Sequence, residues 1–269
     1  MSHDYPSVGF IGAGQMGMPM VARLHAAGVA VTVFARRPEV RDELAERGIA
    51  VAADAAELAS GVDIVEICLF SDEQQQALLF DGGVASAMRP GSILMSHVTG
   101  SPALYDSLVE AVAPGVGVVD APVSGTAEQI AAGQLTVLLG GAATDVQRVT
   151  PVLSAFASRI IHAGPLGDGQ RVKLVNNLLF TVHLRLAGEA VRLGTEFGID
   201  QQRLVNAVMQ CSASSLALSL LADRPFADFG GSFERFLRKD VAVVEAVAAE
   251  LGVDIGLLGD LAHGAIDAG

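Results

Sequence analysis

The segment VGFIGAGQMGMPM, Val8 to Met20, predicts the first strand, turn and helix of the chain. A short apolar run leads into Gly12, Gly14 and Gly17, which have the spacing G-x-G-x-x-G. The first glycine permits a tight turn, the second lets the backbone approach a pyrophosphate, and the third lets the helix pack on the strand. The helix N-terminus would face the phosphates. We therefore predict that a dinucleotide cofactor contacts Gly12, Ala13, Gly14, Gln15, Met16 and Gly17.

The end of the second predicted strand bears on which dinucleotide binds. The run AVTVF is followed by Ala35, Arg36 and Arg37, with no acid where an NAD site usually holds the ribose hydroxyls. An arginine at this place can accommodate the 2′-phosphate of NADP. We predict that NADPH is preferred, with Arg36 the nearer contact and Arg37 the second. The alternative is a pair of solvated arginines at the start of a helix, in which case NAD is possible.

Short apolar runs rich in β-formers alternate with amphipathic helical stretches through the first part of the chain. This alternation predicts crossover units and hence an α/β fold with a mostly parallel, doubly wound sheet covered on both faces. The predicted strands are Val8–Ile11, Ala30–Phe34, Asp63–Phe70, Ile93–Met95, Val116–Val119 and Thr136–Leu139. The helical segments between them include Met16–Ala27, Pro38–Arg47 and Pro102–Val112.

The pattern changes at HAGPLGDG, His162 to Gly169, a joint rich in glycine and proline. We predict an NADP-binding Rossmann domain over residues 1–164 and an all-helical domain for substrate binding and dimerisation over residues 165–269. A long helix, Gln170–Phe197, would join them. It is apolar around much of its circumference, so we expect it to be buried in its own domain or against another subunit of a homodimer or homotetramer. Further helices are predicted over Gln201–Met209, Ser215–Leu221, Phe233–Leu251 and Gly256–Ala268.

The composition argues against several kinds of partner. The net charge of -13 disfavours nucleic acid, because phosphate binding requires clustered positive charge. Polar residues interrupt the apolar runs before they reach the roughly 18 to 20 residues that a membrane span needs. Cys68 and Cys211 make neither a disulfide framework nor a metal cluster, so we expect no metal. The N-terminus lacks a basic segment followed by an apolar core, and we expect a cytoplasmic protein.

Lysine is rare in this sequence, which has fifteen arginines but only Lys173 and Lys239. Arginine stays protonated in proteins, whereas lysine can release its proton in a suitable environment. A position that stays lysine in so arginine-rich a chain therefore suggests acid–base chemistry. Chance survival of two lysines is the alternative.

Four motifs, in order, give a resemblance to a known family. They are GFIGAGQMGMPM at the first turn, DAPVSG over Asp120–Gly125, HAGPLGDGQRVKLVNN over His162–Asn177 and RKDV over Arg238–Val241. Together they resemble the β-hydroxyacid dehydrogenases, which include 3-hydroxyisobutyrate dehydrogenase and tartronate semialdehyde reductase. More distant members are 6-phosphogluconate dehydrogenase and the imine reductases. The resemblance covers nearly the whole chain.

The resemblance implies roles for individual residues. Lys173 matches the catalytic lysine of the family, and Asn176 and Asn177 match the amide pair beside it. Ser124 and Gly125 match the segment that binds the substrate carboxylate, and we predict that Thr126, which follows them, also binds the substrate. The remaining matches lie on the cofactor side: Cys68, Leu69 and Phe70 in the loop along the cofactor, Thr99 near the nicotinamide ribose, and Lys239 with Asp240 in the motif that closes over the cofactor and active site.

The lysine also suits the chemistry. Hydride transfer to a carbonyl leaves negative charge on its oxygen, which needs a proton donor or a cation about 3 Å away. Lysine can supply both, and positions 173, 176 and 177 share one face of a helix because they are spaced i, i+3 and i+4. The resemblance then implies an NADP-dependent oxidoreductase that interconverts a small 3-hydroxy acid, which carries a carboxylate, and its semialdehyde.

Two departures from the family pattern stand beside this prediction. Thr126 occupies a place where a second glycine is usual, which suggests a narrower or differently hydrogen-bonded carboxylate pocket. Ser96, His97 and Val98 stand where an acid and a serine are common. We expect His97 to be a packed or surface residue, although it could approach the active site.

Two alternative functions share the predicted architecture. One is an imine reductase, and the other is a non-catalytic NADP-binding scaffold protein. Imine reductases usually carry another residue at the lysine position, and non-catalytic members typically lose the lysine. Lys173 therefore argues against both.

Overall fold

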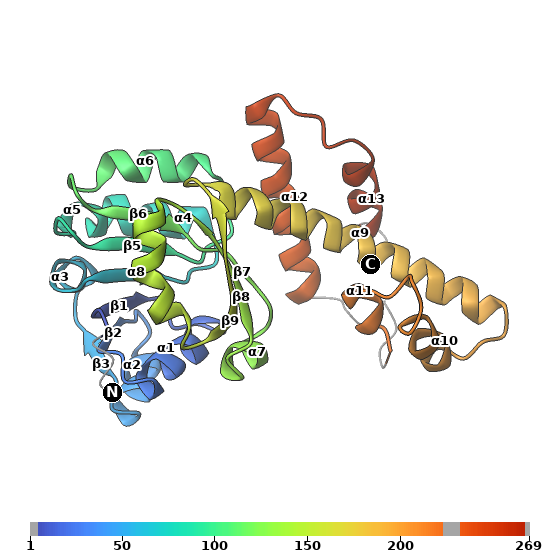
Figure 1. The fold of residues 1–269 in the computed structure, drawn as a ribbon, viewed down its shortest axis with the longest axis horizontal. Helices are drawn as coiled ribbons and strands as arrows, with labels where there is room; N and C mark the ends of the chain where they lie inside the picture. Colours follow the sequence, from blue (N-terminus) through green and yellow to red (C-terminus); the bar gives the residue numbers. More distant parts are fainter. Residues whose placement is uncertain (1–4, 223–231, 267–269) are drawn as a thin grey trace. The chain divides into compact units, whose positions relative to one another are not determined.

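The computed structural model describes residues 5–222 and 232–266. The chain divides into two compact units, Met1–Lys173 and Leu174–Gly269, which are called unit 1 and unit 2 below (Figure 1). None of the helices in the described ranges combines the length and the apolar composition that crossing a membrane requires.

Unit 1 is built on one nine-stranded sheet with the strand order β3-β2-β1-β4-β5-β6-β8-β7, and β9 pairs with β8. All pairs among β1 to β6 are parallel, whereas β8 runs antiparallel to β6 and β7. Between β1 and β4 the strand order reverses, and open α/β sheets bind ligands beyond the carboxyl ends of their strands at such a switch point. The strands are β1 (Val8–Ile11), β2 (Val31–Phe34), β3 (Ala50–Ala52), β4 (Ile64–Ile67), β5 (Ile93–Ser96), β6 (Gly117–Asp120), β7 (Val123–Ser124), β8 (Leu135–Gly140) and β9 (Ala157–Gly164).

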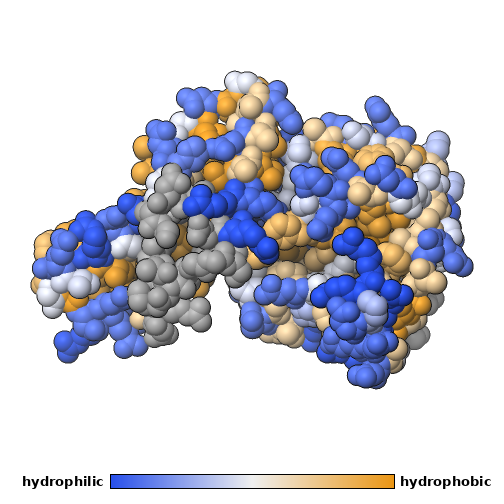
Figure 2. Space-filling model, turned by 180° about the vertical axis from the view of Figure 1, so that it is seen from behind, coloured by the Kyte–Doolittle hydropathy of each residue, from blue (hydrophilic) through white to orange (hydrophobic). Residues whose placement is uncertain are grey.

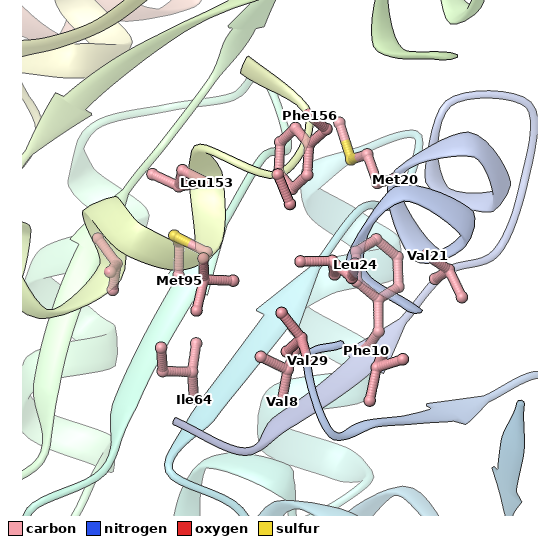
Figure 3. Close-up of a cluster of buried hydrophobic side chains, with 14 of the residues drawn as sticks. Val8, Phe10, Met20, Val21, Leu24, Val29, Ile64, Met95, Leu153 and Phe156 are labelled. Atoms are coloured by element: carbon pink, nitrogen blue, oxygen red, sulfur yellow. The ribbon is translucent and has the colours of Figure 1, made fainter. Parts of the chain in front are cut away.

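Helices cover both faces of this sheet, because successive residues of a strand point to opposite faces and the central strands place buried apolar residues on both. One core lies under α1, α2, α7 and α8 and contains Phe10, Met20, Leu24 and Phe156 (Figure 3). A second core on the other face lies under α3, η1, α5 and α6. The doubly wound α/β prediction is confirmed. The helices of unit 1 are α1 (Gly17–Ala26), α2 (Pro38–Glu46), α3 (Ala55–Gly61), α4 (Asp72–Gln76), the π-helical turn η1 (Ala77–Asp81), α5 (Val84–Ala87), α6 (Ala103–Ala111), α7 (Ala127–Ala131) and α8 (Ala143–Leu153).

Two predicted boundaries are corrected by the structure. The strand predicted over Asp63–Phe70 ends at Ile67, because the chain turns into a loop at Cys68. The joint predicted over His162–Gly169 is partly strand, since β9 continues to Gly164. Most side chains of β9 are exposed or half-buried, so the segment lacks the apolar run that marks the other strands. The short strands β3 and β7 were missed as well.

The described part of unit 2 consists of helices and their connections, as predicted. The long helix α9 (Asp168–Glu196) has 29 residues and runs from unit 1 into unit 2. It packs with its C-terminal neighbours through two small cores, one of which includes Leu178, Val182 and Val241. Asp267 and Ala268, at the end of the predicted helix Gly256–Ala268, lie outside the described residues. The other helices are α10 (Gln201–Val208), α11 (Leu216–Ser219), α12 (Ser232–Leu251) and α13 (Gly256–Ile266).

Candidate active site

The glycine turn between β1 and α1 contains two positions at which a side chain does not fit. Gly12 has φ +109°, and a Cβ there would overlap the carbonyl oxygen of Cys68. A Cβ on Gly17 would overlap the carbonyl oxygen of Gly12. The first glycine therefore allows the turn to touch the loop after β4, and the other allows α1 to start close to β1.

The same turn has room for a phosphate group. A Cβ on Gly14 would meet nothing within 4 Å, and Gly14 and Gln15 are exposed while Ala13 is buried. The N-cap of α1 is Met16, which makes no side-chain capping bond, and the first turn carries no acidic residue. The first N–H groups of α1 therefore suit an anion. This turn fits the pyrophosphate of a dinucleotide.

Three arginines follow β2. Ala35 is buried at the strand end, while Arg36 and Arg37 are exposed. Arg41 on α2 donates from Nη2 to the carbonyl oxygen of Arg36 at 2.8 Å, so a third guanidinium lies beside the predicted pair. Arg37 also lies 3.7 Å from Glu39 in an exposed ion pair, which holds it only weakly. Arg41 was not predicted from the sequence, where its only signal is its place one turn into the helix that follows.

The loop after β4 lies against the glycine turn. The N–H of Cys68 donates to the carbonyl oxygen of Ile11 at 2.9 Å. Burial raises the pKa of the Cys68 thiol to about 12, and the charge of Glu66 acts in the same direction. Cys68 is therefore a packed thiol rather than a nucleophile. Leu69 packs against the second core, and Phe70 is 37% exposed.

A buried carboxylate holds the N-terminus of α9. Asp120, at the end of β6, accepts hydrogen bonds from the N–H groups of Gly167 at 2.6 Å and Gln170 at 2.7 Å. These are among the donors that a helix start leaves unsatisfied. Burial raises the pKa of Asp120, and the two N–H donors act against that rise. Gly169 has no side chain at this contact, where a Cβ would lie 2.6 Å from Asp120 Oδ2.

The predicted catalytic residues lie along α9 after this anchored turn. Lys173 is 9% exposed and Asn177 is 8% exposed, whereas Asn176 is exposed. Lys173 belongs to unit 1, and the two asparagines follow in unit 2.

Within unit 2, the third and fourth sequence motifs meet. Asn177 donates from Nδ2 to Oδ2 of Asp240 on α12 at 2.6 Å, and Lys239 Nζ lies 3.3 Å from the other carboxylate oxygen of Asp240. Asn177 also accepts a hydrogen bond from Asn176 at 3.1 Å. Asp240 thus orients the amide of Asn177 and brings Lys239 close to it. Asn177 and Asp240 are 63 positions apart in the sequence.

The segment predicted to bind the substrate carboxylate lies at the edge of the sheet. Ser124 ends β7 and is half-buried, and Gly125 has φ +143°. Thr126 forms a capping box with Gln129: its hydroxyl accepts from the N–H of Gln129, and its own N–H donates to Gln129 Oε1 at 2.9 Å. A hydrogen bond from Thr126 also lowers the pKa of Glu128. The polar groups of Thr126 therefore serve the start of α7.

His97 is buried and not on the surface. Its Nε2 lies 2.8 Å from Oε1 of Glu66, and its Nδ1 lies 2.7 Å from the carbonyl oxygen of Ala121. Its ring also packs edge-on against Phe156. His97 therefore links β4 to Ala121, the residue that follows Asp120. Its pairing with Glu66 was not predicted from the sequence.

Two family models cover almost the whole chain. Residues 7–164 match the NAD binding domain of 6-phosphogluconate dehydrogenase. Residues 167–266 match the model described as NAD-binding of NADP-dependent 3-hydroxyisobutyrate dehydrogenase.

Curated relatives and solved structures are similar over most of their length. A 3-hydroxyisobutyrate dehydrogenase of Pseudomonas aeruginosa is 32% identical over 93% of this chain and 89% of its own. An NAD-dependent L-serine dehydrogenase of the same organism is 31% identical over 90% of this chain and 85% of its own. The structure of Mycobacterium tuberculosis 3-hydroxyisobutyrate dehydrogenase with L-serine superposes with a TM-score of 0.86 and 28% identity, over 98% of this chain and 92% of that one.

The glycine turn and the position of Lys173 on α9 fit the family that these matches indicate. Both halves of the chain match models from this one group of dehydrogenases, and the named relatives act on different hydroxy acids. The chain therefore belongs to the 3-hydroxyisobutyrate dehydrogenase-like β-hydroxyacid dehydrogenases, a family of NAD(P)-dependent oxidoreductases.

Proposed function

We propose that the protein interconverts a small 3-hydroxy acid and its semialdehyde in the cytoplasm, with Lys173 as the acid–base group. The observation that carries the proposal is the burial of Lys173 on a helix whose first turn is bonded to Asp120, at the carboxyl end of β6. Ligands of open α/β sheets bind beyond these carboxyl ends. The glycine turn and the loop after β4 lie at the same edge of the sheet.

A dinucleotide held by the glycine turn would supply the hydride acceptor for oxidation of the alcohol carbon and, in its reduced form, the hydride donor for the aldehyde carbon. Lys173 takes the hydroxyl proton in the oxidation and donates a proton to the carbonyl oxygen in the reduction. We assign Asn177, oriented by Asp240, and Asn176 to binding the same substrate oxygen. Ser124 and Gly125 bind the substrate carboxylate. Thr126 lies next to them, and its capping box fixes the start of α7 beside that pocket.

A screen of small aldehydo-acids and hydroxy acids tests the reaction class. We expect reduction of at least one aldehydo-acid of three to five carbons, followed through the absorbance of the reduced nicotinamide. Cyclic imines run in parallel represent the alternative activity. Turnover of imines alone would contradict the assignment, and cofactor binding without turnover of any compound would favour the scaffold alternative.

We propose NADP as the preferred cofactor. The support is the cluster of Arg36, Arg37 and Arg41 after β2 and the missing acid at the strand end. We expect kcat/KM for NADPH to exceed that for NADH. In Arg36→Ala, kcat/KM for NADPH should fall about tenfold while that for NADH stays within about twofold, because a phosphate contact is lost. A wild-type ratio below one would contradict the preference.

We propose that α9 mediates a homodimer or a homotetramer. Val175, Leu179, Leu186 and Leu193 share one face by helical periodicity and are 63%, 40%, 51% and 45% exposed. The opposite face is covered within unit 2, where Leu184 and Val191 are buried. Both units also carry hydrophobic patches among hydrophilic residues on the surface drawn in Figure 2. An exposed row of large apolar side chains is typical of an interface.

A further inference from the structure

The segment Val98–Gly100 leaves the sheet at the carboxyl end of β5. The last bond of sheet type before this segment is made by His97, whose N–H donates to the carbonyl oxygen of Ile67 at 2.8 Å. Val98 and Gly100 are buried, so their backbone groups need partners other than water.

One side chain supplies both partners. Gln170 donates from Nε2 to the carbonyl oxygen of Val98 at 2.7 Å and accepts at Oε1 from the N–H of Gly100 at 3.1 Å. Its second Nε2 proton goes to the Tyr105 hydroxyl at 3.0 Å. Because the Val98 oxygen can only accept and the Gly100 N–H can only donate, the orientation of the amide is fixed. The carboxamide thus holds the chain on both sides of Thr99.

Gln170 is itself fixed in place. It is fully buried, and its backbone N–H donates to Asp120 Oδ2 at 2.7 Å. Its backbone and side chain therefore connect the ends of β5 and β6 to the first turn of α9. Lys173 lies three residues further along the same helix, so both residues project from neighbouring positions of one face. A shift of Gln170 would move Thr99 relative to Lys173.

The sheet topology indicates which part of the cofactor Thr99 meets. The two halves of a dinucleotide lie on opposite sides of the switch point. In this chain the arginines proposed for the 2′-phosphate follow β2, on one side of it. The nicotinamide half then lies on the other side, beyond β4, β5 and β6, where Thr99 stands.

We propose that Gln170 is a positioning residue that sets the nicotinamide-side segment around Thr99 relative to Lys173. The proposal rests on the proposed function for the identity of Lys173 as the acid–base group. The hydrogen bonds of Gln170 to Val98, Gly100 and Tyr105 all lie within unit 1 and do not depend on that function.

The test compares Gln170→Met with Tyr105→Phe. The first variant keeps the length of the side chain but removes both bonds to the Thr99 segment. The second is the matched control, because it removes a bond of the same amide and leaves the contacts to Val98 and Gly100. Calorimetry with NADP⁺ and with 2′-phospho-ADP-ribose, which lacks the nicotinamide, separates the two halves of the cofactor.

For Gln170→Met we expect the Kd of NADP⁺ to rise about fivefold while the Kd of 2′-phospho-ADP-ribose changes less than about twofold, as for loss of one ordered contact. The kcat on the best substrate should fall about tenfold or more, because misplaced groups react slowly. Tyr105→Phe should leave both Kd values within about twofold. If Gln170→Met does not fold, Gln170→Asn, whose amide is one methylene shorter and cannot reach both Val98 and Gly100, should show the same selective change.

Equal weakening of both ligands, or an unchanged Kd for NADP⁺, would overturn the proposal. A wild-type protein that binds NADP⁺ but converts no substrate would count against the proposed function. The Kd values of NADP⁺ and 2′-phospho-ADP-ribose would still decide the role of Gln170. If the protein prefers NAD, the same comparison uses NAD⁺ and ADP-ribose.

Discussion

At the residue scale, the most informative side chain is the carboxylate of Asp120, which is buried yet bonded to two backbone N–H groups. Among the described acidic residues, only Asp120 both ends a strand and caps α9, the helix that carries Lys173. Its pKa is raised by burial above the ordinary value of 3.8. Because of this shift, the contribution of Asp120 to the stability of the protein depends on pH.

The sign of that coupling is testable. Because Asp120 binds its proton more tightly in the folded state, its contribution to stability is complete below the ordinary pKa of 3.8 and falls as the pH rises through the raised value. We expect the unfolding free energy of wild type, minus that of Asp120→Asn, to decrease as the pH rises from about 4. Urea unfolding at a series of pH values measures the difference. A difference that grows with pH would show that the bonds from Gly167 and Gln170 outweigh burial.

At the element scale, the capping box of α7 distinguishes a structural role from a substrate role for Thr126. Thr126→Ala removes the capping hydroxyl and should lower the unfolding free energy by about 1 kcal/mol, whereas Thr126→Ser should keep it. Because the polar groups of Thr126 are engaged within α7, we expect KM for the hydroxy acid to change less than about threefold in both variants. Thermal unfolding and steady-state kinetics measure the two effects. A large rise in KM with no loss of stability would place Thr126 in contact with the substrate.

The elements themselves were largely predictable from the sequence, and the exceptions have physical causes. β1 and β5 are buried runs, β2 alternates buried and half-buried residues, and the glycine turn marks the first helix. β9 was missed because its exposed residues break the apolar run, and Cys68–Phe70 were assigned to a strand because they are apolar although the chain turns there.

The candidate site was predictable only where a local motif carries it. The helical pattern predicted one helix for Lys173, Asn176 and Asn177, and all three lie on α9. Spacing cannot predict contacts between distant residues. The bonds of Gln170 to Val98 and Gly100, 72 and 70 positions away, and the pairing of His97 with Glu66, 31 positions away, depend on the sheet order.

At the scale of the whole molecule, the exposed face of α9 predicts assembly. We expect Leu186→Arg to shift the protein to a smaller species, because a charge in an apolar interface is left without a partner. Arg192→Gln on a different face of the same helix, where Arg192 is paired with Glu189 and Glu196, is the control. Light scattering after size exclusion gives the masses. A monomeric wild type, or a Leu186→Arg variant of unchanged mass, would contradict an interface at this face.

Proton transfer by Lys173 is tested by the variant Lys173→Arg. Arginine keeps the positive charge but does not release a proton, so we expect kcat to fall by about 10² to 10⁴ while the Kd of the cofactor changes little. Arg171→Lys, the reverse exchange at an exposed position of the same helix, should leave kcat unchanged. A Lys173→Arg variant that keeps most of the wild-type kcat would contradict the account.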